Sequence, residues 1–115
     1  NFFMNSETEA DVERAVETAL RNNAECIVCM DDLICYQAIA KLRKENISVP
    51  DQVKIASFYN SQMLENVQPS ITSLQYDPRE LGTVACKTLF DYMNGEDVQE
   101  KVMLSYEVLL KNSTQ

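Results

Sequence analysis

The stretch that decides the fold is IVCMDDLICYQAIAKLRKENISVPDQVKIASFYN, residues 27–60. An apolar run, 26–30, ends in the carboxylates Asp31 and Asp32, and a helical pattern then leads to a second apolar run, 53–58. Neither run alternates polar with apolar residues, which is typical of parallel strands buried on both faces. Strand, helix and strand within roughly 30 residues predict one βαβ crossover unit.

Candidate binding residues follow from this unit, because ligands of open α/β sheets bind beyond the carboxyl ends of the strands. Asp31 and Asp32 follow the first strand, and Tyr59 and Asn60 follow the second. Either carboxylate also suits the cap of the next helix, since it accepts orphan N–H groups there. A catalytic carboxylate pair is disfavoured, because adjacent residues need not converge.

The rest of the chain continues the same alternation of strands and helices. The pattern predicts strands at 2–5, 71–76 and 102–110, helices at 9–22 and 78–93, and a helical turn within 60–69. Ser6 with Glu9 suggests a capping box for one helix, and Asp77-Pro78 suggests the start of another. We expect the tail 111–115 to be frayed. This order predicts an α/β fold: an open, mostly parallel sheet with helices on both faces.

Composition restricts the function. The 115 residues suit one domain with a real core, and the net charge of −8 disfavours binding to nucleic acid or to anionic membranes. No apolar stretch is long enough for a membrane span. With no histidine, no Gly-rich loop and no nucleophile constellation, we expect neither an enzyme nor a cofactor.

The four cysteines do not form a metal-binding pattern. Cys26-x-x-Cys29 has the spacing of a zinc or redox motif, but it lies in a predicted strand, where residues three apart face opposite ways. Without histidine or a second CxxC, we expect no zinc. Buried free thiols in a cytoplasmic protein are the favoured interpretation.

Three blocks resemble the LacI/GalR family of transcriptional regulators. Residues 27–60 resemble the family's strand, Asn-Asp, helix, Val-Pro-x-Asp, strand and Gly-Phe-Asp-Asp. Residues 69–74 resemble Pro-x-Leu-Thr-Thr-Val, and 77–82 resemble the Glu-Leu-Gly block that follows. The resemblance covers about residues 24–110, and the three blocks keep the family's order and spacing.

The resemblance implies a periplasmic-binding-protein-like (type I) effector domain, of which residues 1–115 are similar to the C-terminal lobe. A start at Asn1, directly before Phe2-Phe3, suggests a fragment that lacks the N-terminal lobe and the DNA-binding domain. Family members bind a sugar- or nucleoside-like effector between the lobes. They form homodimers and contact DNA only through an N-terminal helix-turn-helix. We therefore expect an effector-sensing and dimerisation module of a repressor.

The resemblance also implies roles for particular residues. Asp31 and Tyr59 stand where the family's motifs reach the effector, and Tyr76 stands at the hinge. Tyr59 and Asn60 replace the two aspartates of Gly-Phe-Asp-Asp, so the effector need not be a simple sugar. An expected dimer interface consists of Tyr36, Ile39, Met63, Leu64 and Val67, with ordinary core packing as the alternative. Helix 78–93 would lack its partner lobe, leaving it to fold back or to dock on a second copy.

Two other classes remain open. One is a lobe of a periplasmic sugar-binding transport protein, against which the free cysteines and the block at 69–74 argue. The other is a small flavodoxin-like α/β receiver or enzyme. A receiver needs an acidic pair on its first strand, and residues 1–5 carry no acid.

Overall fold

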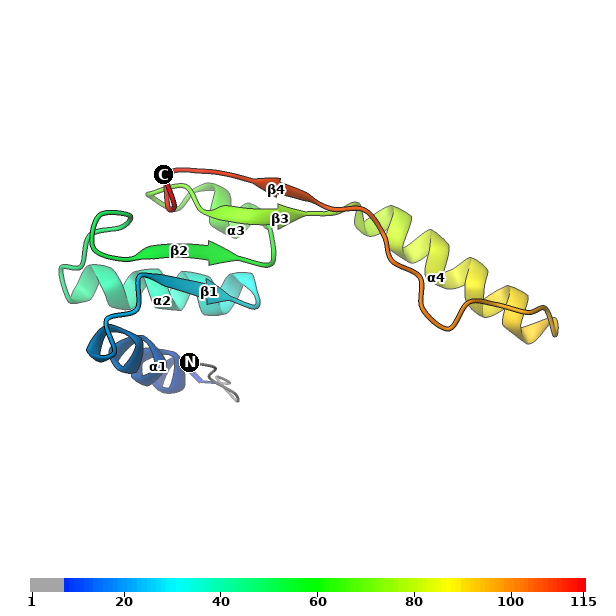
Figure 1. Ribbon diagram of the computed structural model, residues 1–115, viewed down its shortest axis with the longest axis horizontal. Coiled ribbons are helices and arrows are strands. Elements are labelled where there is room, and N and C mark those ends of the chain that lie inside the picture. The colour runs from blue at the N-terminus through cyan, green and yellow to red at the C-terminus, as the bar shows by residue number, and fades with distance from the viewer. Residues whose placement is uncertain (1–7) are drawn as a thin grey trace. The chain divides into compact units, whose positions relative to one another are not determined.

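Residues 8–115 are described in the computed structural model of this protein (Figure 1). The predicted strand at the N-terminus and Ser6 lie outside these residues. The chain divides into two compact units: the first contains residues up to Leu74 together with Val108–Gln115, and the second is Gln75–Glu107. Each unit is described by itself.

The order of elements is the predicted one. The helices are α1 (Glu9–Arg21), α2 (Asp32–Lys44), α3 (Gln62–Glu65) and α4 (Pro78–Met93), and the strands are β1 (Cys26–Cys29), β2 (Lys54–Ser57), β3 (Thr72–Gln75) and β4 (Glu107–Leu109). Each predicted helix and strand within residues 8–100 therefore forms, with its bounds within about two residues of the expectation.

The strands form one sheet in the order β1-β2-β3-β4. Cys29 of β1 is in register with Ser57 of β2, which is in register with Ser73 of β3, and both pairs are parallel. β4 runs back beside β3 in the opposite direction (Figure 1). The predicted open, mostly parallel sheet is confirmed, since β1, β2 and β3 are joined by successive helical crossovers.

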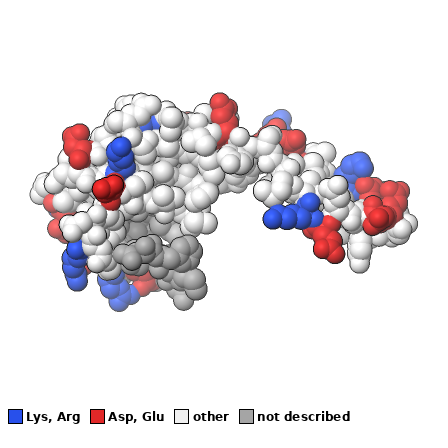
Figure 2. All heavy atoms as spheres, in the orientation of Figure 1, with Lys and Arg blue, Asp and Glu red and all other residues white. Residues whose placement is uncertain are grey.

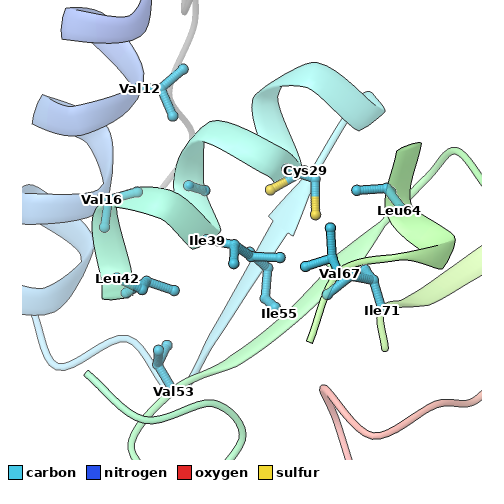
Figure 3. Packing of buried hydrophobic residues seen from close by; sticks show 12 residues of the cluster. Val12, Val16, Cys29, Ile39, Leu42, Val53, Ile55, Leu64, Val67 and Ile71 are labelled. Carbon is cyan, nitrogen blue, oxygen red and sulfur yellow. The ribbon is translucent and has the colours of Figure 1, made fainter. Parts of the chain in front are cut away.

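The hydrophobic core lies between the sheet and α2. Cys29 and Ile55 project from the sheet toward Ile39 and Leu42 of α2 (Figure 3), and all four are at most 3% exposed. The same cluster includes residues of α1, of α3 and of the segment between α3 and β3: Val12, Val16, Leu64, Val67 and Ile71. Helix α1 packs against α2 and contributes to the same cluster.

The opposite side of the sheet is not covered by a helix among residues 8–115, and its apolar side chains are exposed. Side chains alternate along a strand, so Val28 and Phe58 point away from α2. Val28 is 56% exposed, Phe58 is 45% exposed and Val108 of β4 is 51% exposed. Among residues 8–115, helix cover is thus observed on the α2 side of the sheet.

Charged side chains join α1 and α2. Lys41 of α2 is only 6% exposed, and its Nζ donates to Glu17 of α1 at 2.7 Å and to Glu45 at 2.9 Å. Lys44 and Glu13 form a second, exposed pair between the helices at 3.3 Å. A buried ammonium needs such partners, because an unpaired buried charge is strongly destabilising.

The cap of α1 corrects one expectation. Thr8 is the N-cap, and Asp11 completes the capping box, since its carboxylate accepts from the Thr8 backbone N–H at 3.1 Å. Ser6 with Glu9 was therefore the wrong pair, displaced by two residues. Both pairs have the sequence spacing of a capping box, and the choice depends on where the helix begins.

The C-terminal region corrects two further expectations. Only Glu107–Leu109 of the predicted strand 102–110 forms a strand, because Val102 and Leu104 line an apolar groove beside α4 in the second unit. The tail 111–115 is ordered rather than frayed. Ser113 is completely buried and hydrogen-bonds to both Ile55 and Thr72.

The second unit is built on α4. Asp77 caps this helix by accepting from Arg79 N at 2.8 Å, and Pro78 occupies the first turn, as predicted. Gly95, with φ of 79°, follows the C-cap Asn94. None of the residues of α4 is buried, and its apolar stripe forms the groove just described.

Candidate functional site

The candidate site lies at the carboxyl edge of β1 and β2. Because Cys29 and Ser57 are in parallel register, the residues two places further along, Asp31 and Tyr59, leave the sheet at the same edge. The ladder continues past the strand ends, since Phe58 N donates to Cys29 O at 2.9 Å. The structure therefore brings together the two residues that sequence reasoning placed at one rim.

Asp31 is the N-cap of α2, which confirms the capping expectation. Its Oδ1 accepts from Ile34 N at 2.8 Å, while Asp32 Oδ1 accepts from Leu33 N at 3.0 Å. Asp31 is exposed, and its Oδ2 makes no hydrogen bond to any residue in the range 8–115. Capping thus uses one carboxylate oxygen of an exposed residue and leaves the other without a hydrogen bond among residues 8–115.

Tyr59 and Asn60 form the part of the edge that follows β2. Tyr59 is 39% exposed, and its backbone N–H donates to Ser57 Oγ at 3.1 Å. Asn60 Oδ1 accepts from Ser73 Oγ and from Lys111 Nζ, each at 3.0 Å. The side chain of Asn60 is therefore fixed by two hydrogen bonds, one from β3 and one from the C-terminal segment.

Lys111 is the residue of this edge that sequence reasoning missed. It lies 51 residues from Asn60 in a segment that the pattern assigned to a frayed tail. The spacing of apolar residues along the chain cannot predict a contact between residues so far apart. The sequence held one indication of this contact: Asn60 replaces the last aspartate of the motif that residues 57–60 resemble. A change from carboxylate to amide indicates that the residue bonded to it has a different environment.

Tyr76 belongs to the second unit, where it follows β3 directly and is half-buried. The carboxyl-edge residues Asp31, Asp32, Tyr59 and Asn60 belong to the first unit. The structure therefore assembles four of the five predicted binding residues within one unit, and the role of Tyr76 stays a prediction.

The expected dimer residues separate into two groups. Ile39, Leu64 and Val67 are at most 5% exposed and belong to the core, so their packing partners lie within the chain. For these three the alternative interpretation, ordinary core, is the correct one. Tyr36 is 49% exposed and Met63 is 46% exposed, and they lie on α2 and α3, which pack together.

The expectation of buried thiols is correct for Cys29 and Cys35 and wrong for Cys26 and Cys86, which are exposed. Cys26 and Cys29 differ in burial, as strand alternation predicts. Cys26 is exposed and Cys29 is buried, and both are free thiols. A hydrogen bond with the Cys35 thiol, together with burial, raises the pKa of Cys29 far above its ordinary value. In the part of the chain that the structure describes, no three His, Cys, Asp or Glu side chains gather closely enough to hold a metal ion.

No helix within residues 8–115 combines the length and apolar character needed to cross a membrane.

Comparison with known proteins extends these findings. The family model of the periplasmic binding protein-like domain matches residues 2–114. Catabolite control protein A of Staphylococcus xylosus is 27% identical over 113 residues, which are 97% of this chain and 34% of that protein. The chain thus spans about a third of the length of this curated relative.

Solved structures agree. The transcription regulator CcpA of Lactococcus lactis matches with a TM-score of 0.84 at 25% identity, over 100% of this chain and 45% of that one. A LacI family transcriptional regulator from Bifidobacterium animalis subsp. lactis matches with a TM-score of 0.81 at 24% identity, over 94% and 41%. The chain belongs to the periplasmic-binding-protein-like domain family and has the effector-domain fold of LacI/GalR-type regulators.

Proposed function

We propose that this chain is the C-terminal lobe of the effector-binding domain of a LacI-type transcriptional regulator, and that it senses a small molecule. The observation that carries the proposal is the shared edge of Asp31 and Tyr59 on neighbouring parallel strands. Such an edge is where open α/β sheets bind their ligands. The named relatives are themselves transcriptional regulators, which favours sensing over catalysis.

The chemistry of the edge suits a sugar- or nucleoside-like effector. The second carboxylate oxygen of Asp31 can accept a hydrogen bond from a hydroxyl group of the effector. A carboxylate in a binding site strongly favours a ligand with such a donor over an analogue that lacks it. The ring of Tyr59 offers an apolar face with one hydroxyl group, suited to a sugar ring or a base. In the whole regulator, a bound effector would shift the equilibrium between open and closed lobes.

The test is an NMR titration of the 15N-labelled chain with glucose and with adenosine. We expect saturable shifts at Asp31 and Tyr59, and weak affinity, because a single lobe supplies one wall of the cleft. Asp31→Asn retains a cap-forming side chain but loses the carboxylate. It should weaken binding, whereas the matched variant Asp51→Asn, on the turn before β2, should not.

Two results would contradict the proposal. One is that Asp31→Asn and Tyr59→Ala both bind the effectors as tightly as the unaltered chain. The other is that the NMR shifts caused by the effectors map to residues away from the carboxyl edge. Screening the whole regulator for ligand-induced thermal stabilisation checks the same effectors against a complete cleft.

The proposal includes homodimerisation through the exposed surface of α2 and α3. Tyr36 and Met63 are each about half exposed, and Leu33, one turn before Tyr36, is 53% exposed. Exposed apolar side chains on two packed helices suit a self-complementary two-fold interface. Ile39 of α2 and Leu64 of α3 are core residues, so both helices are packed into the core through their other faces.

Sedimentation of Tyr36→Asp tests the dimer. A charged side chain at the centre of an apolar interface should give a monomer, because the buried carboxylate would lack a partner. Lys54→Asp, on the exposed start of β2, provides a charge-changing control outside the surface. An unchanged dimer in the Tyr36 variant would reject this interface.

DNA contact is assigned to a separate helix-turn-helix rather than to this lobe. Figure 2 shows Lys and Arg interspersed with Asp and Glu on the face in view, and the chain carries a net charge of −8. A nucleic-acid surface needs clustered positive charge, so binding of DNA by this chain alone should be negligible.

A further inference from the structure

Helix α4 ends at the one Asn-Gly pair of the sequence, Asn94 and Gly95. Gly95 N–H donates to Tyr92 O at 3.1 Å. Glu96 N–H donates to Asp91 O at 3.0 Å. These two hydrogen bonds form a Schellman motif, in which the residue after the C-cap takes a left-handed conformation, and Gly95 has a φ of 79°. Other residues adopt this conformation only with strain, so the helix end depends on a glycine directly after Asn94.

The pair is open to solvent. Asn94 and Gly95 are both exposed. Apart from its chain neighbours, no heavy atom lies within 4 Å of the position that a Cβ on Gly95 would take. Among residues 8–115, the side-chain amide of Asn94 makes no hydrogen bond. The chain around this turn therefore neither covers the amide nor holds it in one orientation.

The backbone at this turn sets the one barrier to a reaction between the two residues. Asn94 has a ψ of 1°, and its carboxamide carbon meets the Gly95 nitrogen only after rotation about that bond. The rotation breaks the Schellman hydrogen bonds. Exposed hydrogen bonds at a helix end open locally with little cost in free energy, and none of the residues of α4 is buried. The reacting atoms therefore meet during local opening of the last turn.

The chemistry is an intramolecular substitution followed by hydrolysis. A solvent base removes the proton of Gly95 N–H, and the nitrogen attacks Asn94 Cγ. The N–Cγ bond forms, the Cγ–Nδ2 bond breaks, and ammonia leaves with a proton from water. Water then opens the cyclic imide at either of its carbonyl groups. The net reaction consumes water, releases ammonia and gives aspartate or isoaspartate, in which the main chain runs through Cγ.

We propose that Asn94 is a site of spontaneous deamidation, with water as the co-reactant, and that the reaction loosens the end of α4. The new carboxylate lies at the negative end of the helix dipole, and the last turn carries no basic residue to offset it. Isoaspartate also lengthens the main chain, which moves Gly95 N–H and Glu96 N–H away from their acceptors. Tyr92 and Glu96 line the apolar groove beside α4, so the groove changes shape with the turn.

Asn112 provides a comparison within the same chain. Ser113, which follows it, also has a small side chain, but Ser113 is completely buried and its N–H donates to Ser70 O at 3.0 Å. Ring closure at Asn112 would break a hydrogen bond in the packed part of the first unit. The fold therefore protects Asn112 and leaves Asn94 open to the reaction.

The test is incubation of the unaltered chain in mildly alkaline water enriched in heavy oxygen, followed by peptide mass spectrometry. We expect the Asn94 peptide to gain the isotope several-fold faster than the Asn112 peptide, and to contain both aspartate and isoaspartate. Urea should accelerate the reaction several-fold at Asn112 and change it little at Asn94, since the fold protects only the former. Asn94→Gln should abolish conversion at this position, because the longer side chain closes a larger ring slowly.

Three results would overturn the site. They are equal rates at Asn94 and Asn112 in the folded chain, a product that contains aspartate alone, and acceleration by urea that is as large at Asn94 as at Asn112. The first and third would show that the fold does not distinguish the two positions. The second would show direct hydrolysis without the imide.

Hydrogen exchange of Asn94→Asp tests the loosening of the helix end. We expect several-fold faster exchange at the Gly95 and Glu96 amides, with exchange in the first unit unchanged. Gln99→Glu adds the same charge at an exposed position beyond the helix and should leave these two amides unaffected. Unchanged exchange in Asn94→Asp, or an equal increase in Gln99→Glu, would overturn the effect on α4.

Discussion

Ser113 Oγ donates a hydrogen bond of 2.6 Å to the backbone carbonyl oxygen of Ile55 and accepts one of 2.9 Å from Thr72 N. The backbone oxygen of Ser113 also accepts from Ile55 N at 3.1 Å. β2 and β3 are in direct register only from Ala56 and Thr72 onward. Ser113 therefore satisfies backbone groups at the point where the two strands begin to pair, and it ties the C-terminal segment to both strands.

Ser113→Ala should destabilise the protein by about 1–3 kcal/mol, because it leaves the buried Ile55 carbonyl and the Thr72 N–H each short of a partner. Urea unfolding followed by circular dichroism measures the effect. Ser105→Ala, at an exposed serine of the second unit, should change the free energy of unfolding by less than about 0.5 kcal/mol. Equal stability of the two variants would show that the buried hydroxyl contributes nothing.

Asp31→Ala should cost about 1 kcal/mol of stability, because the first turn of α2 loses its side-chain acceptor. Asp31→Asn should cost much less, since asparagine is an equally good N-cap. Thermal unfolding of the two variants separates capping from ligand binding. If the two variants were equally destabilised, the carboxylate charge rather than the cap would be responsible.

The ion pair between α1 and α2 should make stability depend on pH in acid. The hydrogen bond from Lys41 lowers the pKa of Glu17 below its ordinary value of 4.5, so the unfolded chain binds a proton more readily than the folded one. The contribution of Glu17 is therefore present above pH 4.5 and is lost as the pH falls through the lowered pKa.

Urea unfolding of Glu17→Gln from pH 7 to pH 3 checks this linkage. We expect the variant to be less stable at pH 7 and to lose less stability in acid than the unaltered chain. Glu100→Gln, an exposed glutamate of the second unit, should follow the unaltered chain at every pH. A Glu17 variant with the same acid slope as the unaltered chain would contradict the linkage.

The four thiols should differ in reactivity. Cys86 is exposed, whereas Cys29 and Cys35 are buried, and the raised pKa of Cys29 removes its reactive thiolate at neutral pH. Partial burial also raises the pKa of Cys26. Labelling with iodoacetamide and peptide mass spectrometry should find Cys86 modified first, Cys26 more slowly, and Cys29 and Cys35 only in urea. Rapid native labelling of Cys35 would show that the core opens readily.

Local patterns predicted most of the elements because their causes are local. Asp77-Pro78 starts α4 through a cap and a preset φ angle, and the apolar run ending at Cys29 forms β1. The cap of α1 shows the limit of such reasoning. Thr8 with Asp11 and Ser6 with Glu9 have the same spacing, and no local rule decides between them.

The candidate site could be predicted in part. Asp31 and Tyr59 follow neighbouring strands, so the general rule for parallel sheets places them at one edge. The residues of the proposed dimer surface could not be separated from the core in advance, because Ile39 and Tyr36 are three residues apart on one helix. Which of them faces the sheet depends on how α2 and α3 pack.

The amino-acid sequence by itself determined the order of helices and strands, the parallel crossovers and the carboxyl edge that holds Asp31 and Tyr59. These features depend on periodicity and capping between residues close along the chain. Only the tertiary structure decided that Ser113 bridges Ile55 of β2 and Thr72 of β3 and that Lys111 donates to Asn60. Those contacts join residues 58 and 51 positions apart, so they form only when packing has brought the C-terminal segment beside β3, and no local pattern encodes that encounter.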